Sequence, residues 1–499
     1  MTAGPAFSAS RFPIGLFLLG IALRLPGLLF FGMADLYQIL LEWGAAVHHV
    51  GLVEAFGINY GILSYAAFGA AEAAAEWMPR FWWAPYKLLV IAFDSGACIS
   101  LLALVAPNDR RWLLVLVWLN PWFVLHGAYW GFWEGAHLLF GLLAVLALRR
   151  IADEGRAWAA AGALIMCSAM FKPQGLGHFA GPLALYLAVQ YMRGTRRPLG
   201  AFLAGLAAVA LVTSLGIWIF GGSPLALYHN YRYVSATMAK ISNGGPGLWR
   251  FVSWAYMEAT HQAGLVLDMK ISRPALALLT AASGLLCLGI FLPFATHVGL
   301  RRRDPGKPHP PALARWLGAP DARWPDAQAT FAVLALGTLV MSQFGPRAHI
   351  NHSYVAMVML AVFALRDRVL FRLWVAMNVM LGLAHLSAFG LGGSVVMLPA
   401  SQWFRYPNAG LLLDRVRQLP AYSSPDGLLR FQAAVNELLT HLPGPRAISV
   451  MSLLVCLTAC GILWRLFRSF DQGMGSAWNL PASGREGAQT VQGKAPRSG

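Results

Sequence analysis

The sequence predicts an all-α polytopic membrane protein, and three observations support this prediction. Of its 499 residues, 58% are hydrophobic and only 12% are charged, whereas soluble proteins carry about 25% charged residues. Apolar runs of about 18 residues or more recur, which is the length that an α-helix needs to cross a bilayer. The basic residues, which bring the net charge to +17, cluster between apolar runs, as the positive-inside rule describes. A soluble multidomain protein, a disordered chain and a nucleic-acid-binding protein all fit these features badly.

The apolar runs predict about 12 transmembrane helices, within a range of about 10–13. The first run, near 13–31, is too long for the apolar core of a signal peptide, so we expect it to remain as the first membrane helix. The other expected spans lie near 86–106, 112–126, 135–149, 157–171, 177–192, 200–220, 274–297, 327–344, 352–365, 373–391 and 447–464.

Residues 1–466 are expected to form one membrane-embedded domain. Three long outer loops fall within it, at about 32–85, 221–273 and 392–446, and each mixes aromatic residues, Gly and Pro with helical periodicity. This mixture predicts amphipathic helices that lie along the membrane interface, for example from Tyr37 to Gly51. The tail at 467–499 is polar and rich in Gly and Ser, and we expect it to be disordered and cytoplasmic.

The positions of Lys and Arg predict that both chain ends face the cytoplasm. Roughly 23 of the 38 basic residues fall on the inner side of this scheme. The short outer loops hold only Lys172 and Arg347. The excess of Arg over Lys and the richness in Ala are typical of a bacterium with a GC-rich genome, so the expected location is the inner membrane with an outer face toward the periplasm. The five cysteines lie in apolar stretches without the spacing of a zinc site, and we interpret them as packing residues.

Several ionisable residues lie at or near membrane depth, where each costs about 2.5–3.5 kcal/mol to insert. Asp35 follows the first span in the stretch GMADLYQILLEWG and is either a helix cap or a catalytic acid–base group. Arg24 lies within the first span and Asp94 within the second. A structural pairing of Asp94 with Arg24 or another buried donor is the favoured interpretation, and an anionic ligand for Arg24 is the alternative.

Four outer segments are rich in polar residues, and the topology places all of them on the same side. They supply an acidic group (Asp35, Glu42, Glu54 and Glu134) and a cationic group (Lys172, Arg347, His349 and His352). An aromatic belt with one solvated Glu134 and a snorkelling Lys172 are the simpler interpretations. The pair His349 and His352 would bind a metal only with a third ligand, which the sequence does not offer. Arg forks and His donors suit phosphate oxygens better.

The order of these features resembles the GT-C class of integral-membrane glycosyltransferases, over roughly residues 10–390. Each motif is weak alone, and the resemblance depends on their order. Two positions depart from the family pattern, and both bear on which sugar is transferred. Ile350 stands where the family has an acid, and the aromatic-Pro-Pro sequence is missing near Tyr60. The motifs are Asp35 with Trp43 to Gly51 and Tyr60 to Gly69, Lys87 to Asp94, Asn120-Pro121 with Trp130, Gly131 and Glu134, Lys172-Pro173-Gln174, Ser242-Asn243 with Leu248-Trp249, and His349-Ile350-Asn351-His352.

This resemblance implies an inverting transfer of a hexose or pentose, with mannose favoured, from a polyprenyl-phosphate-sugar to a lipid-linked or cell-envelope glycan acceptor. Asp35 would be the catalytic base. Glu134, Glu54 and Trp130 would bind sugar or acceptor. Lys172, Gln174, Arg347, His349 and His352 would bind the donor phosphate. No cofactor and no metal are expected, and the partners would be the lipid substrates and membrane lipids, with no nucleic acid.

Three other functions stay open at this stage. A secondary transporter or flippase for a lipid-linked or anionic solute would place polar residues in the middle of broken helices. A membrane-bound O-acyltransferase would need a buried catalytic histidine, for which His385 has a suitable position. A ligase that moves whole glycans from a lipid diphosphate would need room for the diphosphate and a long glycan.

Overall fold

A computed structural model of the chain describes residues 12–30, 32, 36, 38–57, 60–78, 81–192, 194–237, 245–260, 273–301, 324–345, 350–389 and 445–471. Throughout these ranges the regular structure is helical, and no β-strand occurs in them. The predicted all-α class is therefore confirmed for the described part of the chain.

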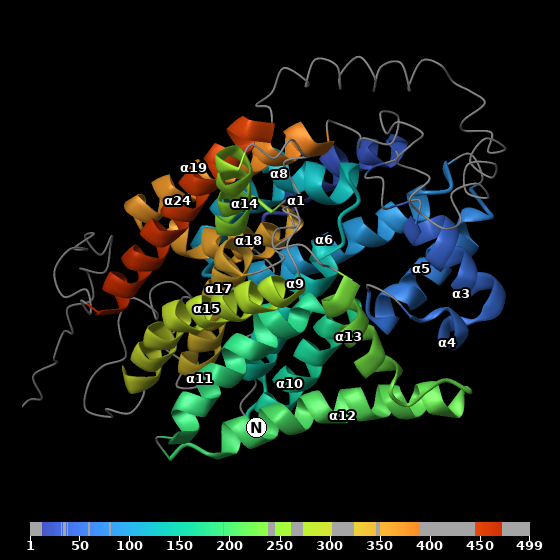
Figure 1. The fold of residues 1–499 in the computed structure, drawn as a ribbon, viewed down its shortest axis with the longest axis horizontal. Helices are drawn as coiled ribbons and strands as arrows, with labels where there is room; N and C mark the ends of the chain where they lie inside the picture. The colour runs from blue at the N-terminus through green and yellow to red at the C-terminus, as the bar shows by residue number, and fades with distance from the viewer. Residues whose placement is uncertain are drawn as a thin grey trace, which may run out of the picture.

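The helices follow one another with short connections through the first half of the chain (Figure 1). Many are interrupted by 3₁₀ or π segments, which are labelled η. The N-terminal half contains α1 (Ile14–Arg24), η2 (Leu25–Leu29), η3 (Gln38–Gly44), α3 (Ala45–Val50), α4 (Leu52–Ala55), α5 (Ile62–Ala75), α6 (Ala84–Leu104), η5 (Pro107–Asp109), α7 (Arg110–Leu113), η6 (Leu114–Trp118), α8 (Pro121–Val124), η7 (Leu125–Tyr129), α9 (Glu134–Arg150), α10 (Glu154–Phe171), η8 (Leu176–Ala180), α11 (Gly181–Met192) and α12 (Arg197–Ile219). The C-terminal half contains α13 (Ala226–Thr237), α14 (Leu248–Ala259), α15 (Arg273–Arg301), α17 (Trp324–Phe344), η9 (Ile350–His352), α18 (Ser353–Ala364), α19 (Arg368–Phe389) and α24 (Pro445–Asp471).

Each apolar run that predicts a span coincides with helix, but fewer helices are long and apolar enough to cross a membrane unaided. Six described helices meet that test, and a seventh crossing is formed if the bent pair Pro107–Trp118 and Pro121–Tyr129 is one span. The two parts of that pair are inclined by 62°, because Pro121 lacks the N–H that would continue the helical ladder. The structure thus has the helices of a multi-pass membrane protein.

Three features of the structure differ from those expected from the sequence. The run near 13–31 is not one helix, because α1 changes to the 3₁₀ segment η2 at Leu25, next to Pro26. The segment from Tyr37 to Gly51 does not lie wholly on the surface, since Ile39 and Leu40 are completely buried. The helix α24 continues to Asp471, so the start of the tail expected to be disordered from 467 onward is helical, and 472–499 lie outside the described residues.

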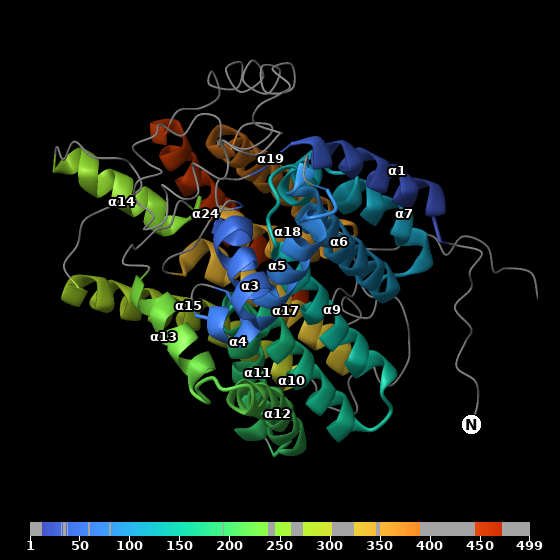
Figure 2. The ribbon, with the colours of Figure 1, turned by 90° about the vertical axis from the view of Figure 1, so that its right-hand side faces the viewer.

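The two most enclosed helices, α17 and α18, lie in the middle of the bundle in both views (Figure 1 and Figure 2). Every residue of α18 is buried, as expected for a helix that is apolar on all sides and surrounded by protein. In contrast, α12 runs along the lower edge of the bundle (Figure 1) and exposes large apolar side chains such as Leu211 and Val212. That face suits contact with lipid chains.

The helices α10 and α12 touch through their backbones. A Cβ atom built on Gly162 would lie 2.1 Å from the Phe202 carbonyl oxygen, and one built on Gly205 would lie 2.0 Å from the Ala159 carbonyl oxygen. Small residues at helix contacts of this kind let two backbones approach closely, which is how membrane helices associate without a hydrophobic driving force. This contact fixes α10, whose last residue precedes Lys172.

The two ends of the bundle carry different chemistry, as α9 shows, since Glu134 begins this helix and Arg149 lies in its last turn. One end, which we name the arginine end, gathers Arg110, Arg149, Arg366 and Arg465. Arg366 and Arg465 form ion pairs with Asp109 and Asp367, while Arg110 and Arg149 donate to backbone carbonyls. The opposite end, which we name the site end, gathers Glu134, Lys172, His178 and His352.

Candidate functional site

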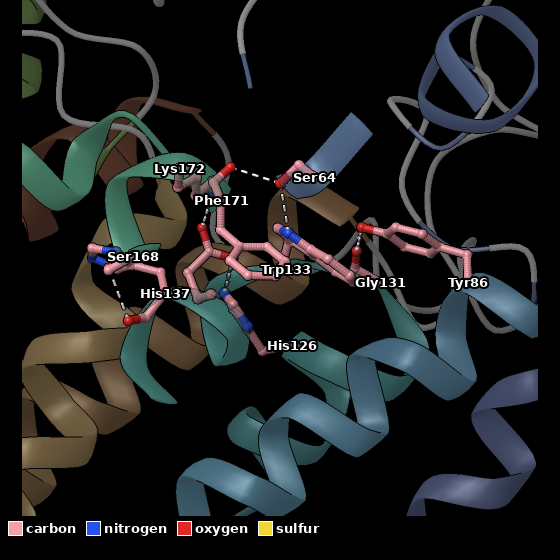
Figure 3. A network of polar contacts seen from close by, with 10 residues as sticks. Ser64, Tyr86, His126, Gly131, Trp133, His137, Ser168, Phe171 and Lys172 are labelled. Carbon is pink, nitrogen blue, oxygen red and sulfur yellow. Dashed lines mark hydrogen bonds and ion pairs between the residues drawn. The ribbon is translucent and has the colours of Figure 1, made fainter. Parts of the chain in front are cut away.

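A buried ion pair between Glu134 and Lys172 forms the centre of the site end (Figure 3). Glu134 is the first residue of α9, where a carboxylate is favoured by the helix dipole. Lys172 follows the last residue of α10. The side chains are 2% and 6% exposed, respectively, and Lys172 Nζ donates directly to the Glu134 carboxylate. Close packing of α9 on α10 brings together two residues that lie 38 positions apart.

Histidines surround this ion pair on several sides. His126, in η7, has its Nε2 atom 3.8 Å from the second carboxylate oxygen of Glu134. His137, one turn further along α9, has Nδ1 2.6 Å from Ser168 Oγ. Its ring centroid lies 5.5 Å from that of His178, which in turn lies 5.2 Å from that of His352. The three last-named rings therefore form a continuous row beside Lys172.

The short segment before Glu134 is held by hydrogen bonds from three other elements (Figure 3). Trp133 Nε1 donates to Ser64 Oγ over 2.9 Å, and Ser64 Oγ donates to the Phe171 carbonyl over 2.6 Å. Tyr86 donates to the Gly131 carbonyl over 3.0 Å. Gly131 has φ +78, a conformation that side-chain-bearing residues rarely adopt. The position of Glu134 is thus set by α5, α6 and α10 together.

Several buried polar atoms around the ion pair have no hydrogen-bond partner among the residues that the structure describes. These atoms are Glu134 Oε2, Gln174 Oε1, Asn351 Oδ1, His137 Nε2 and His178 Nδ1. The side chain of Asn351 also faces the Glu134 carboxylate. Buried polar groups are hydrogen-bonded in the large majority of cases, since leaving one unpaired costs about 1–3 kcal/mol. A group of such atoms at one place favours a polar ligand or water molecules as their partner.

The residues that the sequence predicts as site residues lie in different environments in the structure. Asp35, Arg347 and His349 lie outside the described residues. Glu54 is exposed on α4, whereas the ion pair is buried. Gln174 is half-buried beside Lys172. Trp130 is fully buried, and its ring stacks on that of His385 at a centroid distance of 5.5 Å. The direct pairing of Glu134 with Lys172 was not expected, because the sequence assigned these residues to separate acidic and cationic groups.

A second buried cluster lies next to this site and involves Asp94. Asp94 accepts a hydrogen bond from Tyr354 over 3.2 Å. Arg24 instead donates to the Trp118 carbonyl over 2.7 Å, with its guanidinium 3.5 Å from the centre of the Trp118 ring. Both Arg24 and Asp94 are described, and no ion-pair contact joins them. Asp94 is therefore paired structurally with a buried donor, as expected, and that donor is Tyr354 rather than Arg24.

Sequence reasoning missed His126, His178 and Tyr354 as parts of this region. The ring of His126 stacks on that of Tyr354 with centroids 4.2 Å apart, which connects the Asp94 cluster to Glu134. The only available signal was a histidine inside an apolar run, which most often indicates a packed residue. Within the described residues, no group of three His, Cys, Asp or Glu side chains is arranged to hold a metal ion.

Comparisons of the chain with protein-family models and with curated proteins give no match.

Proposed function

We propose that this protein is an inverting glycosyltransferase of the integral-membrane GT-C kind. It moves a hexose or pentose, with mannose favoured, from a polyprenyl-phosphate-sugar to a lipid-linked or cell-envelope glycan acceptor. The chain crosses the membrane about 12 times, with its site end on the periplasmic or outer face of a bacterial inner membrane. The order of sequence motifs and the chemistry of the site end support this proposal.

The observation that carries the proposal is a set of buried acceptor oxygens on Glu134, on Asn351, which faces it, and on Gln174, two residues after Lys172. Glu134 Oε2, Gln174 Oε1 and Asn351 Oδ1 have no partner in the described part of the chain, and none of these oxygens donates a hydrogen bond. A ligand that satisfies them must donate several hydrogen bonds. Sugar hydroxyls do so, whereas an ionised phosphate offers only acceptor oxygens. These oxygens are therefore better suited to bind a sugar than a phosphate.

This chemistry changes the role that we assign to Lys172. Because its ammonium donates to the Glu134 carboxylate, its charge is already balanced and it orients that carboxylate toward sugar hydroxyls. Neutralising the donor phosphate then falls to Arg347, His349 and His352, of which His352 packs against His178 near Lys172. Arg forks and histidine donors stabilise negative charge as it develops on a phosphate.

In the proposed reaction, Asp35 takes the proton of the acceptor hydroxyl as its oxygen attacks the anomeric carbon. The bond from that carbon to the polyprenyl-phosphate oxygen breaks, and the lipid phosphate leaves with the electron pair. A single carboxylate is sufficient because the phosphate is a good leaving group. Glycosidases, in contrast, use two carboxyl groups to expel a poor one.

The test supplies the purified full-length protein in liposomes with labelled polyprenyl-phosphate-sugars, one at a time. We expect one donor to be consumed, and Glu134→Gln to raise KM for sugar or acceptor. Leu88→Met, a change at an exposed position on α6, serves as the control and should retain full activity. If no donor is consumed and none raises the melting temperature of the protein, the proposal is overturned.

The buried contacts of Arg24 and Asp94 favour one alternative, a secondary transporter or flippase, since ionisable groups inside a bundle often mark ion or substrate pathways. The glycines around Asp94 argue against a pathway there. A Cβ atom on Gly127 or Gly135 would lie 2.0 or 2.1 Å from the Asp94 carboxylate, so the cluster is closely packed. Counterflow of a lipid-linked or anionic solute in liposomes would support the transporter.

An O-acyltransferase that uses His385 is less well supported. His385 is fully buried among the rings of Trp122, Trp130 and His126, and its Nδ1 lies 2.8 Å from the Leu381 carbonyl. These contacts indicate a packed ring. His385→Phe, which keeps the ring shape, would abolish acyl transfer but leave glycosyl transfer largely intact.

A further inference from the structure

The first turn of α6 binds the backbone of two separate segments that lead into the site. Trp83 Nε1 donates to the Leu28 carbonyl over 2.9 Å, and Tyr86 donates to the Gly131 carbonyl over 3.0 Å. Lys87 donates to carbonyls of both segments, the end of η2 and the end of η7. We name the side chains of Trp83, Tyr86 and Lys87 the α6 clamp.

Lys87 makes the central contacts of the α6 clamp. It is fully buried, and its Nζ donates to the carbonyls of Gly27, Phe30 and Tyr129 over 2.9, 2.5 and 2.7 Å. An ammonium group has three donors, so these contacts use all of them. Among the described residues, no carboxylate forms an ion pair with Lys87. Its contacts are therefore to the backbone alone.

The three carbonyls belong to two helical segments that end at the same place. Gly27 and Phe30 lie in and directly after η2, and Tyr129 is the last residue of η7. The Gly27 carbonyl also accepts from Phe30 N–H, and carbonyls at helix ends carry partial negative charge. Lys87 supplies a cation that offsets the repulsion between two such ends.

The two segments are also in direct backbone contact. A Cβ atom on Gly27 would lie 2.6 Å from the Ala128 carbonyl oxygen, and one on Gly32, where φ is +110, would lie 2.7 Å from the Trp130 carbonyl oxygen. The side chains of Phe30 and Tyr129 meet with ring centroids 5.3 Å apart. The chain then continues from Phe30 to Asp35, and from Tyr129 to Glu134.

From these contacts we propose that Lys87 is a positioning residue, which locks the end of η2 to the end of η7, the two segments from which the chain continues toward Asp35 and Glu134. This inference builds on the proposed function only in naming Asp35 and Glu134 as site residues. The lock is the contact that Lys87 makes between the ends of η2 and η7, and the distance between these ends can be probed without any enzymatic activity.

The test uses a full-length protein whose five native cysteines are replaced, with Phe30→Cys and Tyr129→Cys added. These two changes leave the carbonyl acceptors intact. A short bis-thiosulfonate reagent crosslinks the pair, and the crosslinking rate is measured for Lys87→Met, Lys87→Arg and the control Leu88→Met. Leu88 is the next residue of α6 but faces outward.

We expect Lys87→Met to slow crosslinking at least tenfold, Lys87→Arg to slow it two- to fivefold, and Leu88→Met to leave it unchanged. Crosslinking of folded Lys87→Met at the parent rate overturns the proposal. If Lys87→Met does not fold, Lys87→Arg and Tyr86→Phe replace it. Unchanged rates in both of these variants also overturn the proposal.

A kinetic measurement separates the lock from the proposed function. In a protein that transfers sugar, Lys87→Arg should lower kcat at least fivefold with KM for the donor changed less than twofold. Slow crosslinking with an unchanged kcat would overturn the positioning role. If no donor is transferred by any variant, the proposed function fails while slow crosslinking still supports the lock.

Discussion

At the scale of single residues, Glu134 and Lys172 are each other's main electrostatic partner in a place where water is scarce. Ionised groups at membrane depth are costly, and the two charges offset that cost only while both are present. The second carboxylate oxygen of Glu134 accepts no hydrogen bond from the described residues and has His126 Nε2 3.8 Å away, which supports a function for the carboxylate besides the ion pair. The two roles can be separated by paired substitutions.

We expect Glu134→Gln to destabilise the folded protein by about 3–5 kcal/mol, because it leaves the Lys172 ammonium buried without a counter-charge. The double variant Glu134→Gln with Lys172→Met removes both charges and should recover most of that stability. Thermal unfolding in detergent measures both effects. Activity should stay low in the double variant, and full recovery of activity would contradict a sugar-binding role for Glu134.

Asp35→Asn should abolish transfer, by about 10²-fold or more, while the protein stays folded and binds its donor. Asn is nearly isosteric with Asp but cannot take up the proton of the acceptor hydroxyl, so the loss should appear in the chemical step. Donor binding and single-turnover transfer are measured on the same preparation. Normal activity per folded molecule would remove Asp35 as the base and favour Glu134 or Glu54.

At the scale of elements, the helices are joined by contacts that tolerate no extra atoms. The pairs α10–α12 and α6–α9 both depend on glycines, at Gly162 and Gly205 in the first and at Gly135, against Asp94, in the second. The lipid around a helix is as apolar as its own side chains. Close packing therefore supplies the stabilising free energy that burial from water supplies in soluble proteins. These contacts hold Glu134 and Lys172 at the facing ends of α9 and α10.

Gly205→Ala should lower stability by about 1–3 kcal/mol, because the new methyl group would meet the Ala159 carbonyl and push α12 from α10. Gly216→Ala, in the same helix, is the matched control. No atom outside its own helix neighbourhood lies within 4 Å of a Cβ built there, so this change should be neutral or stabilising by up to about 1 kcal/mol. Equal melting temperatures for the two variants would contradict the contact.

At the scale of the whole molecule, the bundle has a polar site end and an arginine end. At the arginine end, Arg366 pairs with Asp109 and Arg465 pairs with Asp367. This asymmetry matches the distribution expected when arginines remain on the cytoplasmic side. It supports the proposed orientation, in which both chain ends and the segment 301–326 face the cytoplasm.

Cysteine labelling in sealed vesicles tests this orientation. Asn108→Cys at the arginine end and Lys307→Cys should react with a membrane-impermeant reagent only from the cytoplasmic side. Glu54→Cys, exposed on α4, should react only from the opposite side. Labelling of position 307 from outside alone would overturn the orientation and, with it, the proposed mechanism.

The sequence by itself determined the all-α class and the approximate positions of the helices, because these depend on composition and on the local spacing of apolar residues. It also singled out Glu134 and Lys172 as unusual, since each lies beside an apolar run. It did not determine that they pair, that Tyr354 rather than Arg24 donates to Asp94, or that Lys87 joins η2 to η7. Tyr354 and Asp94 lie 260 positions apart, and no local pattern encodes such a contact.

Only the tertiary structure decided which apolar helices face protein and which face outward. The helices α18 and α12 are both strongly apolar, yet α18 is wholly buried while much of α12 is exposed. In a soluble protein, the polarity of the residues distinguishes an inner face from an outer one. Lipid chains are as apolar as leucine, so a face that contacts lipid has the same composition as a face that contacts protein. Shape complementarity therefore decides the packing, through glycines such as Gly162 and Gly205, and it becomes visible only when the helices are brought together.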